Sequence, residues 1–181
     1  MGNKTGRSAQ KVATSRKSSS IEVVIETPKD TSNKFKYDPG SHSFKLSKVL
    51  PEGMVFPYDF GFVPATKGPD GDPIDVLVLM DEPTFPGCFL ECRLVGILEA
   101  EQKARNLKKK RNDRLIAVAE QSLLYADIAR LGDLNRALLK QVEAFFVNYQ
   151  KVRDVSFTIL AHSGPERALE VLREATAKKN A

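Results

Sequence analysis

Short alternating runs of apolar and polar residues fill the first two thirds of the chain. β-Branched and aromatic residues dominate these runs, and Gly, Pro, Asp and Asn separate them, which is the pattern of β-strands joined by turns. Several short strands at this spacing predict a closed barrel or a sandwich. The strands are predicted within residues 21–27, 34–50 (a hairpin turning at Pro39 and Gly40), 54–66, 73–80, 89–98 and 114–119.

The apolar period changes to three or four residues after Asp133. Apolar residues recur at this spacing from Leu134 to Tyr149, and Asp133 is a suitable N-cap, so the stretch predicts an amphipathic helix of about four turns. A last helix is expected to begin near Pro165 and to end in basic residues, both of which favour helix ends. The predicted fold class is α+β, with a small β-barrel and helices packed on its outside.

The positive charge of the chain is concentrated at its beginning. The 181 residues carry 28 Lys and Arg against 23 Asp and Glu, a formal net charge of +5. Residues 1–20 hold five basic and no acidic side chains, so residues 21–181 balance 23 of each sign. A polar, Ser-rich segment cannot bury enough apolar surface to fold, so we expect a disordered basic tail over 1–20 and a single domain over 21–181. The neutral domain argues against nucleic-acid binding.

Cysteine and histidine are scarce in this sequence. Cys88 and Cys92 stand four residues apart in the run GCFLECRLVGIL, where a strand would hold them on one face about 13 Å apart, too far for a disulfide. The two histidines, His42 and His162, make a zinc site of the usual Cys/His type a poor interpretation. Free thiols are typical of a reducing compartment, so a cytoplasmic protein is expected. No run approaches about 18 apolar residues, so no membrane span is predicted.

Three carboxylates crowd into the stretch DGDPIDVLVL at residues 70–79. A turn explains Asp70 and Asp72, because Asp, Gly and Pro are turn formers. It does not explain Asp75, which opens an apolar strand, where a buried carboxylate needs a cation or a metal. An EF-hand loop is excluded, since its obligatory glycine position is occupied by Asp75. The spacing favours hard divalent cations such as Mg²⁺, which prefer oxygen ligands.

Charged side chains also occur on the strands that precede this cluster. Glu26 ends the first strand, Lys36 and Asp38 share one side of the next by alternation, and Lys48 ends the following one. Carboxylates that hold Mg²⁺ beside cations that take phosphate oxygens are what phosphoryl transfer needs. The alternative is that these charged side chains only face the solvent from the strand surfaces, which is the usual role of a single lysine.

Stretches of the chain resemble, in order, the motifs of the soluble family I inorganic pyrophosphatases over residues 21–175. The most specific is DGDPIDVLV, and VVIETP, KFKYD, FPYDFGFVP, PGCFLECRLVGIL and FFVNYQK support it. The resemblance implies an OB-like five-stranded barrel with helices outside. It also implies Mg²⁺-dependent hydrolysis of inorganic pyrophosphate to two phosphates by a metal-activated water, in a homo-oligomer.

The resemblance assigns roles to individual residues of the chain. Asp72 would orient the water or take its proton, and Lys36 and Tyr149 would complete the catalytic set. The substrate would be bound by Lys36, Lys48, Arg114, Tyr149 and Lys151. The metals would be held by Glu26, Asp38, Asp70, Asp72, Asp75 and Asp113.

The chain also departs from the family pattern at several site positions. Two further metal-binding Asp positions of the family fall near Glu101 or Gln102 and at Asn112 or Asp113. The other departures are Asp38 where many members have Glu, Lys48 for Arg, Phe60 for Tyr, Arg114 for Lys, and Gln150 for Lys with Lys151 one place later.

These departures leave three functions open. The first is an active pyrophosphatase, and the second is a diverged pseudoenzyme that binds metal or phosphate with little turnover. The third is a nucleic-acid-binding barrel that uses the basic tail and the stretch LKKKR. The carboxylate cluster argues against the third function, because it would repel a phosphate backbone.

We expect a chain that lacks residues 1–19 to fold and to turn over like the full chain, because this segment has too few apolar residues to contribute to a core. Melting temperature and steady-state rate of the two proteins test this. A clear loss of either quantity would show that the segment packs on the domain or reaches its site.

Overall fold

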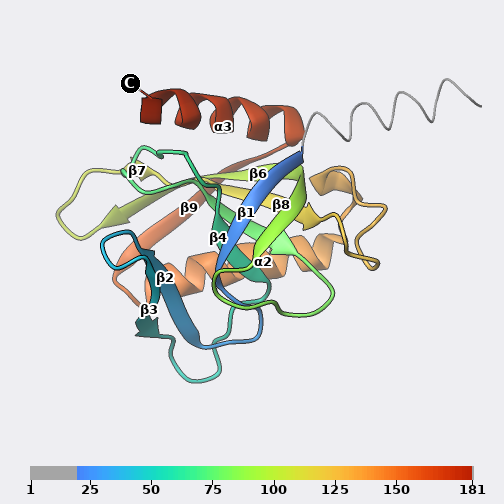
Figure 1. Ribbon diagram of the computed structural model, residues 1–181. Coiled ribbons are helices and arrows are strands. Elements are labelled where there is room, and N and C mark those ends of the chain that lie inside the picture. The colour runs from blue at the N-terminus through green and yellow to red at the C-terminus, as the bar shows by residue number, and fades with distance from the viewer. Residues whose placement is uncertain (1–19, 181) are drawn as a thin grey trace, which may run out of the picture.

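The computed structural model describes residues 20–180. The predicted tail over 1–20 therefore lies outside the described residues, except for Ser20, which begins the first strand. Figure 1 shows a strand-rich body with one helix on each side. The strands are β1 (Ser20–Thr27), β2 (Asn33–Asp38), β3 (Ser43–Val49), β4 (Asp59–Phe62), β5 (Asp75–Leu79), β6 (Phe89–Ala104), β7 (Lys110–Arg111), β8 (Arg114–Ala119) and β9 (Val155–Ser163).

Five of these strands pair into a ring. Strand β1 pairs with β4, β4 with β5, β5 with β8, β8 with β6, and β6 pairs back with β1. Only β5 and β8 run parallel within this ring. Strands β2 and β3 form a separate hairpin, as the Pro-Gly turn predicted. The α+β class is confirmed, and the description of the ring as an OB-like barrel stays a prediction.

Strand β9 was not predicted from the sequence. It pairs antiparallel with the second half of β6, which extends beyond the predicted range to Ala104. Most of its residues are exposed or half-buried, and Phe157 is the buried one. The alternation of apolar and polar residues from Val155 to Ile159 was a strand signal that the sequence reasoning missed.

The helices lie close to where periodicity placed them. Helix α2 spans Arg136–Lys151 and α3 spans Pro165–Asn180. The predicted N-cap of the first helix is wrong, because Asn135 accepts the bond from the Ala137 N–H, at 2.8 Å. Asp133 instead ends a short 3-10 turn, η1 (Leu131–Asp133), and its carboxylate accepts from two backbone N–H groups before it.

The core has two parts, one on each side of the strands. Val142, Phe146 and Tyr149 of α2 pack with Phe60 and other strand residues in the first part. Ala168 and Ala175 of α3 pack against the opposite faces of β1, β5, β6 and β8 in the second part. Apolar residues on both faces explain why β5 reads as a continuous apolar run. Helix α2 lies along one side of the strands (Figure 1), and Tyr149 and Gln150 of its last turn line a cavity together with residues of β1, β5 and β8.

Both cysteines are free, and Cys92 is buried among apolar side chains. Burial raises the pKa of the Cys92 thiol to about 12, which makes it a poor nucleophile. Neither helix described in the structure has the length and apolar character that crossing a membrane requires.

Gly61 is a position where the strand pairing leaves no room for a side chain. A Cβ at Gly61 would collide with the carbonyl oxygen of Val24 on the neighbouring strand β1. We expect Gly61→Ala to lower the free energy of unfolding by more than about 2 kcal/mol, because backbone on a paired strand cannot move aside. Chemical denaturation measures the loss.

Gly132 is the matched control, since a Cβ there meets nothing within 4 Å. Gly132→Ala should leave stability unchanged or slightly raised. Equal losses in the two variants would contradict the close approach of β4 to β1.

Candidate active site

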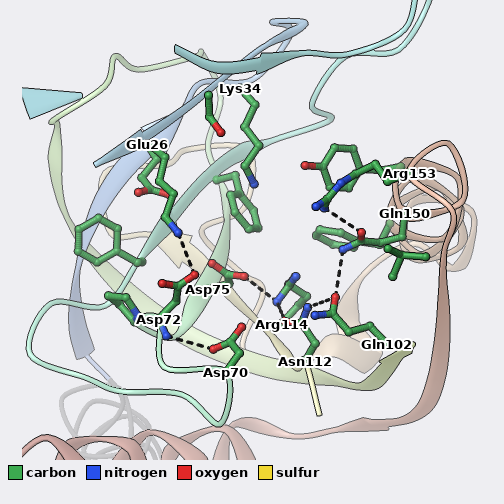
Figure 2. Close-up of a pocket in the computed structure, with 18 of the residues that line it drawn as sticks. Glu26, Lys34, Asp70, Asp72, Asp75, Gln102, Asn112, Arg114, Gln150 and Arg153 are labelled. Carbon is green, nitrogen blue, oxygen red and sulfur yellow. Dashed lines mark hydrogen bonds and ion pairs between the residues drawn. The ribbon is translucent and has the colours of Figure 1, made fainter. Parts of the chain in front are cut away.

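One cavity of about 500 Å³ opens where the ring, the hairpin of β2 and β3, and the end of α2 meet (Figure 2). Acidic side chains from β1 and the 70–75 turn line one half of it. Basic and amide side chains from β8, β6 and α2 line the other half. The predicted site residues that line this cavity are Glu26, Lys36, Lys48, Asp70, Asp72, Asp75, Arg114 and Tyr149.

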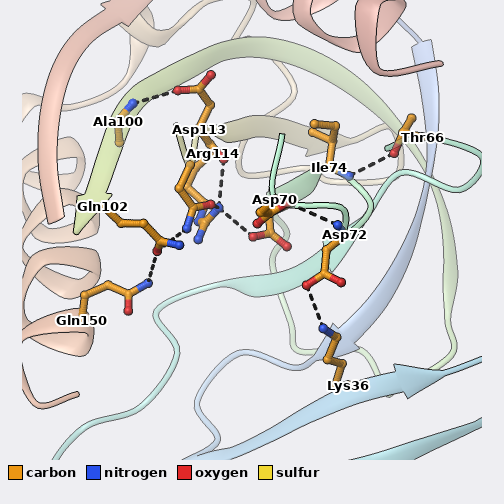
Figure 3. A network of polar contacts seen from close by, with 12 residues as sticks. Lys36, Thr66, Asp70, Asp72, Ile74, Ala100, Gln102, Asp113, Arg114 and Gln150 are labelled. Carbon is orange, nitrogen blue, oxygen red and sulfur yellow. Dashed lines mark hydrogen bonds and ion pairs between the residues drawn. The ribbon is translucent and has the colours of Figure 1, made fainter. Parts of the chain in front are cut away.

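The turn before β5 presents its three aspartates to the cavity. The Gly68 N–H donates to the Asp72 carbonyl at 2.7 Å, and Gly71 adopts a φ of +96°, which favours glycine. The Ile74 N–H donates to Thr66 Oγ1 at 3.0 Å, which anchors the end of the turn (Figure 3). The turn residues predicted from PDGDP therefore serve to hold the carboxylates in place.

Each of two aspartates is paired with a cation. Asp75 Oδ2 lies 2.6 Å from Arg114 Nη1, and Asp72 Oδ2 lies 2.8 Å from Lys36 Nζ. The Arg114 side chain is only 7% exposed, whereas the Lys36 and Asp72 side chains are 50% and 60% exposed. The first pair is therefore structural, and the second contributes little to stability in water.

The remaining acidic groups of the cavity carry an electrostatic cost. Burial, together with the neighbouring Asp75 and Asp72, raises the pKa of Asp70, although the Asp72 N–H donates to its carboxylate. Burial likewise raises the pKa of Glu26, against the effect of the bond from the Tyr37 N–H at 2.7 Å. A cation at this half of the cavity would relieve both groups.

The donor chemistry of this half fits a hard divalent cation. Among the described residues that line the cavity, carboxylates are present and neither His nor Cys is. Within residues 20–180 no three such side chains stand ready around one point to hold a metal. Figure 2 shows Asp75 turned to Arg114, and Figure 3 shows Asp72 turned to Lys36.

Lys34 is a site residue that the sequence reasoning missed. Its Nζ lies 4.9 Å from the ring centre of Phe60 and 5.5 Å from that of Tyr149, inside the cavity. Burial lowers the pKa of Lys34. The signal was available, because Lys34 shares the alternation of Lys36 on the same strand.

Two buried donors on the basic wall have no partner among the described residues. Arg114 Nε and the Tyr149 hydroxyl both make no hydrogen bond, although each is shielded from water. Leaving such groups unpaired costs about 1–3 kcal/mol each. An anionic ligand in the cavity would supply the missing acceptors.

Three amide side chains complete the basic wall. Gln102 Oε1 accepts from Asn112 Nδ2 at 2.5 Å and from Gln150 Nε2 at 3.4 Å. Asn112 Oδ1 in turn accepts from Arg114, and Gln150 Oε1 accepts from Arg153 Nη1 at 3.0 Å. Of the two pairs of alternative positions, Gln102 and Asn112 line the cavity. Their alternatives, Glu101 and Asp113, do not line it.

Three predicted site residues lie outside the cavity. Asp38 sits at the tip of the hairpin, where Lys45, Ser41 and the Gly40 N–H hold its pKa down to about 2. Asp113 accepts from the Ala100 N–H at 2.8 Å and lines a neighbouring cavity instead (Figure 3).

Lys151 lies exposed at the end of α2. The structure therefore does not bring Asp38 and Lys151 to the other site residues, whereas Asp113 lines the neighbouring cavity together with Asp70, Asp75 and Arg114.

Phe60, which stands where the family has Tyr, belongs to both the core and the cavity wall. Its side chain is buried, its ring centre lies 5.7 Å from that of Phe56 and 6.2 Å from that of Phe146, and it faces Lys34.

Comparison with known proteins identifies the family. The sequence model of the inorganic pyrophosphatases matches residues 23–180. The chain belongs to the inorganic pyrophosphatase family. An inorganic pyrophosphatase of Methanosarcina acetivorans is 35% identical over 156 residues, 86% of this chain and 90% of that protein. One from Synechocystis is 32% identical over 154 residues, 85% of this chain and 88% of that protein.

Solved structures agree with this membership. The inorganic pyrophosphatase from Thermus thermophilus matches with a TM-score of 0.83 at 29% identity, over 99% of this chain and 95% of that chain. The enzyme from Helicobacter pylori gives a TM-score of 0.83 at 28% identity, over 92% of this chain and 96% of that chain. The resemblance carried by the motifs is thus confirmed, while the roles of single residues stay predictions.

Asp70 offers a test of the electrostatic cost in this family member. Its pKa is raised in the fold, so its stabilising protonated form is lost as pH rises above the ordinary value of about 3.9. At pH 7 in EDTA, Asp70→Asn should raise the melting temperature by about 1–3 °C, and the difference should vanish below about pH 3.

The control for this test is Asp127→Asn, an exposed aspartate that lines neither cavity. Saturating Mg²⁺ should stabilise the original protein more than Asp70→Asn. A lower melting temperature for Asp70→Asn in EDTA would show that its carboxylate is well solvated or paired.

Proposed function

We propose that the protein is an enzyme that hydrolyses inorganic pyrophosphate to two phosphates and requires Mg²⁺. The observation that carries this proposal is the division of the cavity. Carboxylates suited to a divalent cation face two buried donors, Arg114 Nε and the Tyr149 hydroxyl, that find no acceptor in the part of the chain that the structure describes. A metal complex of a small polyanion satisfies both halves at once.

Asp70, Asp72 and Asp75 would hold the metal, with Glu26 near them on β1. Mg²⁺ bound there would lower the pKa of a coordinated water and neutralise part of the substrate's charge. The turn that precedes β5 fixes the spacing of these carboxylates before any ligand arrives.

The basic wall would bind the substrate and stabilise the charge that develops on the leaving phosphate. Among the described residues Arg114 and Tyr149 offer unpaired donors, and Lys34 adds a positive charge beside the Tyr149 ring in the same cavity. Lys48 lines the same cavity from β3. Donors that are already positioned need little reorganisation when the phosphate leaves.

Asp72 is the residue we assign to orient the water or accept its proton. It is more exposed than Asp75, and within residues 20–180 it forms one ion pair, the accessible one with Lys36. Lys36 would keep the carboxylate facing the cavity and would contact a phosphate oxygen after the pair opens.

We further propose a cytoplasmic location and a homo-oligomer, as the resemblance implies. The two free cysteine thiols support the cytoplasmic location, because thiols stay reduced in that compartment. The pseudoenzyme and the nucleic-acid-binding barrel are less well supported. The cavity keeps both the carboxylates that would bind a metal and the buried donors that would bind a phosphate group.

The first test is phosphate release from pyrophosphate by the purified protein. We expect turnover with Mg²⁺, none in excess EDTA, and inhibition by Ca²⁺, which takes more ligands at longer distances and is a weaker Lewis acid. Full activity in EDTA would refute the metal requirement, and no activity with any divalent cation would favour the pseudoenzyme.

Asp72→Asn sharpens the same assay. Its ion pair with Lys36 is exposed, so the variant should fold normally and lose a factor of about 10²–10⁴ in rate. Asp127→Asn should keep full activity. A fully active Asp72→Asn would remove Asp72 from the proton transfer.

A further inference from the structure

A chain of hydrogen bonds crosses the basic wall of the cavity from β8 to the end of α2. It consists of Asn112, Gln102 and Gln150, which we name the amide bridge, and it ends on Arg114 at one side and Arg153 at the other. Figures 2 and 3 show Gln102 at its centre, contacting Gln150 in both views.

Every side-chain oxygen of the amide bridge already accepts a hydrogen bond. The Gln102 oxygen accepts from two amide groups, and the Asn112 and Gln150 oxygens each accept from a guanidinium. A metal bound by these oxygens would have to displace those donors. It would also lie beside two positive guanidinium groups, which disfavours a second cation.

The amide bridge also fixes how Arg114 is used. Its Nη1 bonds to Asp75, to Asn112 and to the Asp113 carbonyl, and its Nε is left without a partner. A neutral partner holds the guanidinium without cancelling its charge, whereas a carboxylate at position 112 would pair with it. Asp75 is then the carboxylate that Arg114 pairs with, and because Asn112 adds no second negative charge, the guanidinium becomes available for an anion when a metal binds Asp75.

We propose that the amide bridge is an arm of the site that takes no metal and positions Arg114 and Arg153 for the phosphate groups of the substrate. Divalent cations then bind only at the carboxylate half of the cavity. The inference rests on the proposed function for the identity of the anion, while the metal count and the anion affinity are measured without turnover.

The metal count tests the first half of the inference. Mn²⁺ is titrated into the full chain and into each variant, and free Mn²⁺ is followed by its electron paramagnetic resonance signal. Gln102→Ala removes the central amide from a half-buried position and should bind the same number of Mn²⁺ ions as the original chain. The loss of one ion would show that the bridge oxygens are ligands and would overturn the proposal.

Two carboxylate substitutions test why the arm excludes cations. The double variant Gln102→Glu with Asn112→Asp keeps the shape of the bridge and should bind about one more Mn²⁺ per chain than the original. The two carboxylates can bind a cation, whereas the amide oxygens they replace already accept hydrogen bonds. Gln121→Glu, an exposed change of the same charge, should bind the original number. No gain in the double variant would contradict the inference.

Anion affinity tests the positioning role. Methylenediphosphonate, which is not hydrolysed, should bind Gln102→Ala about tenfold more weakly, because the two arginines lose their fixed geometry. The melting temperature of the variant is measured alongside, and equal diphosphonate affinity in a folded Gln102→Ala would refute the positioning role.

These readouts separate the inference from the proposed function. An original chain that binds diphosphonate and Mn²⁺ as expected but releases no phosphate from pyrophosphate would refute the activity and leave the role of the amide bridge standing.

Discussion

The ion pair between Arg114 and Asp75 connects the two halves of the site. Strands β5 and β8 are the parallel pair of the ring, and Val76 lies opposite Leu115 in their register. Asp75 and Arg114 therefore stand side by side where the two strands begin, with 2.6 Å between their charged atoms. A guanidinium buried this far needs a charged partner, and removing that partner would leave an uncompensated charge inside the domain.

This ion pair makes the carboxylate half and the basic half depend on each other. Any cation that binds Asp75 shares that carboxylate with Arg114, so binding of a metal changes how strongly the guanidinium is held. The amide bridge then keeps Arg114 in place with neutral groups. The domain balances its charges overall, yet one cavity gathers carboxylates beside cations, which suits a ligand made of a metal and a polyanion.

Patterns that are local in the sequence predicted much of the fold and part of the site. Runs of β-branched and aromatic residues bounded by turn residues predicted the strands of the ring, and the Pro-Gly turn predicted the hairpin. The three-to-four-residue period predicted α2, and Pro165 with the basic residues that follow predicted α3. Strand β9 was missed although apolar and polar residues alternate from Val155 to Ile159, and its pairing with β6 showed it. Asp133 looked like an N-cap, but the chain makes a 3-10 turn there first, so Asn135 takes that role.

The sequence by itself determined that carboxylates at 70, 72 and 75 form one turn at the mouth of an apolar strand, because their spacing is short enough for local geometry to hold them. Only the tertiary structure decided which distant residues meet them. It selected Lys34 beside Lys36, and it left Asp38 at the hairpin tip with Lys45. Of the two neighbours just before β8, it turned Asn112 to the cavity and Asp113 to the Ala100 N–H, since the pairing of β8 with β6 sets how the chain enters the strand.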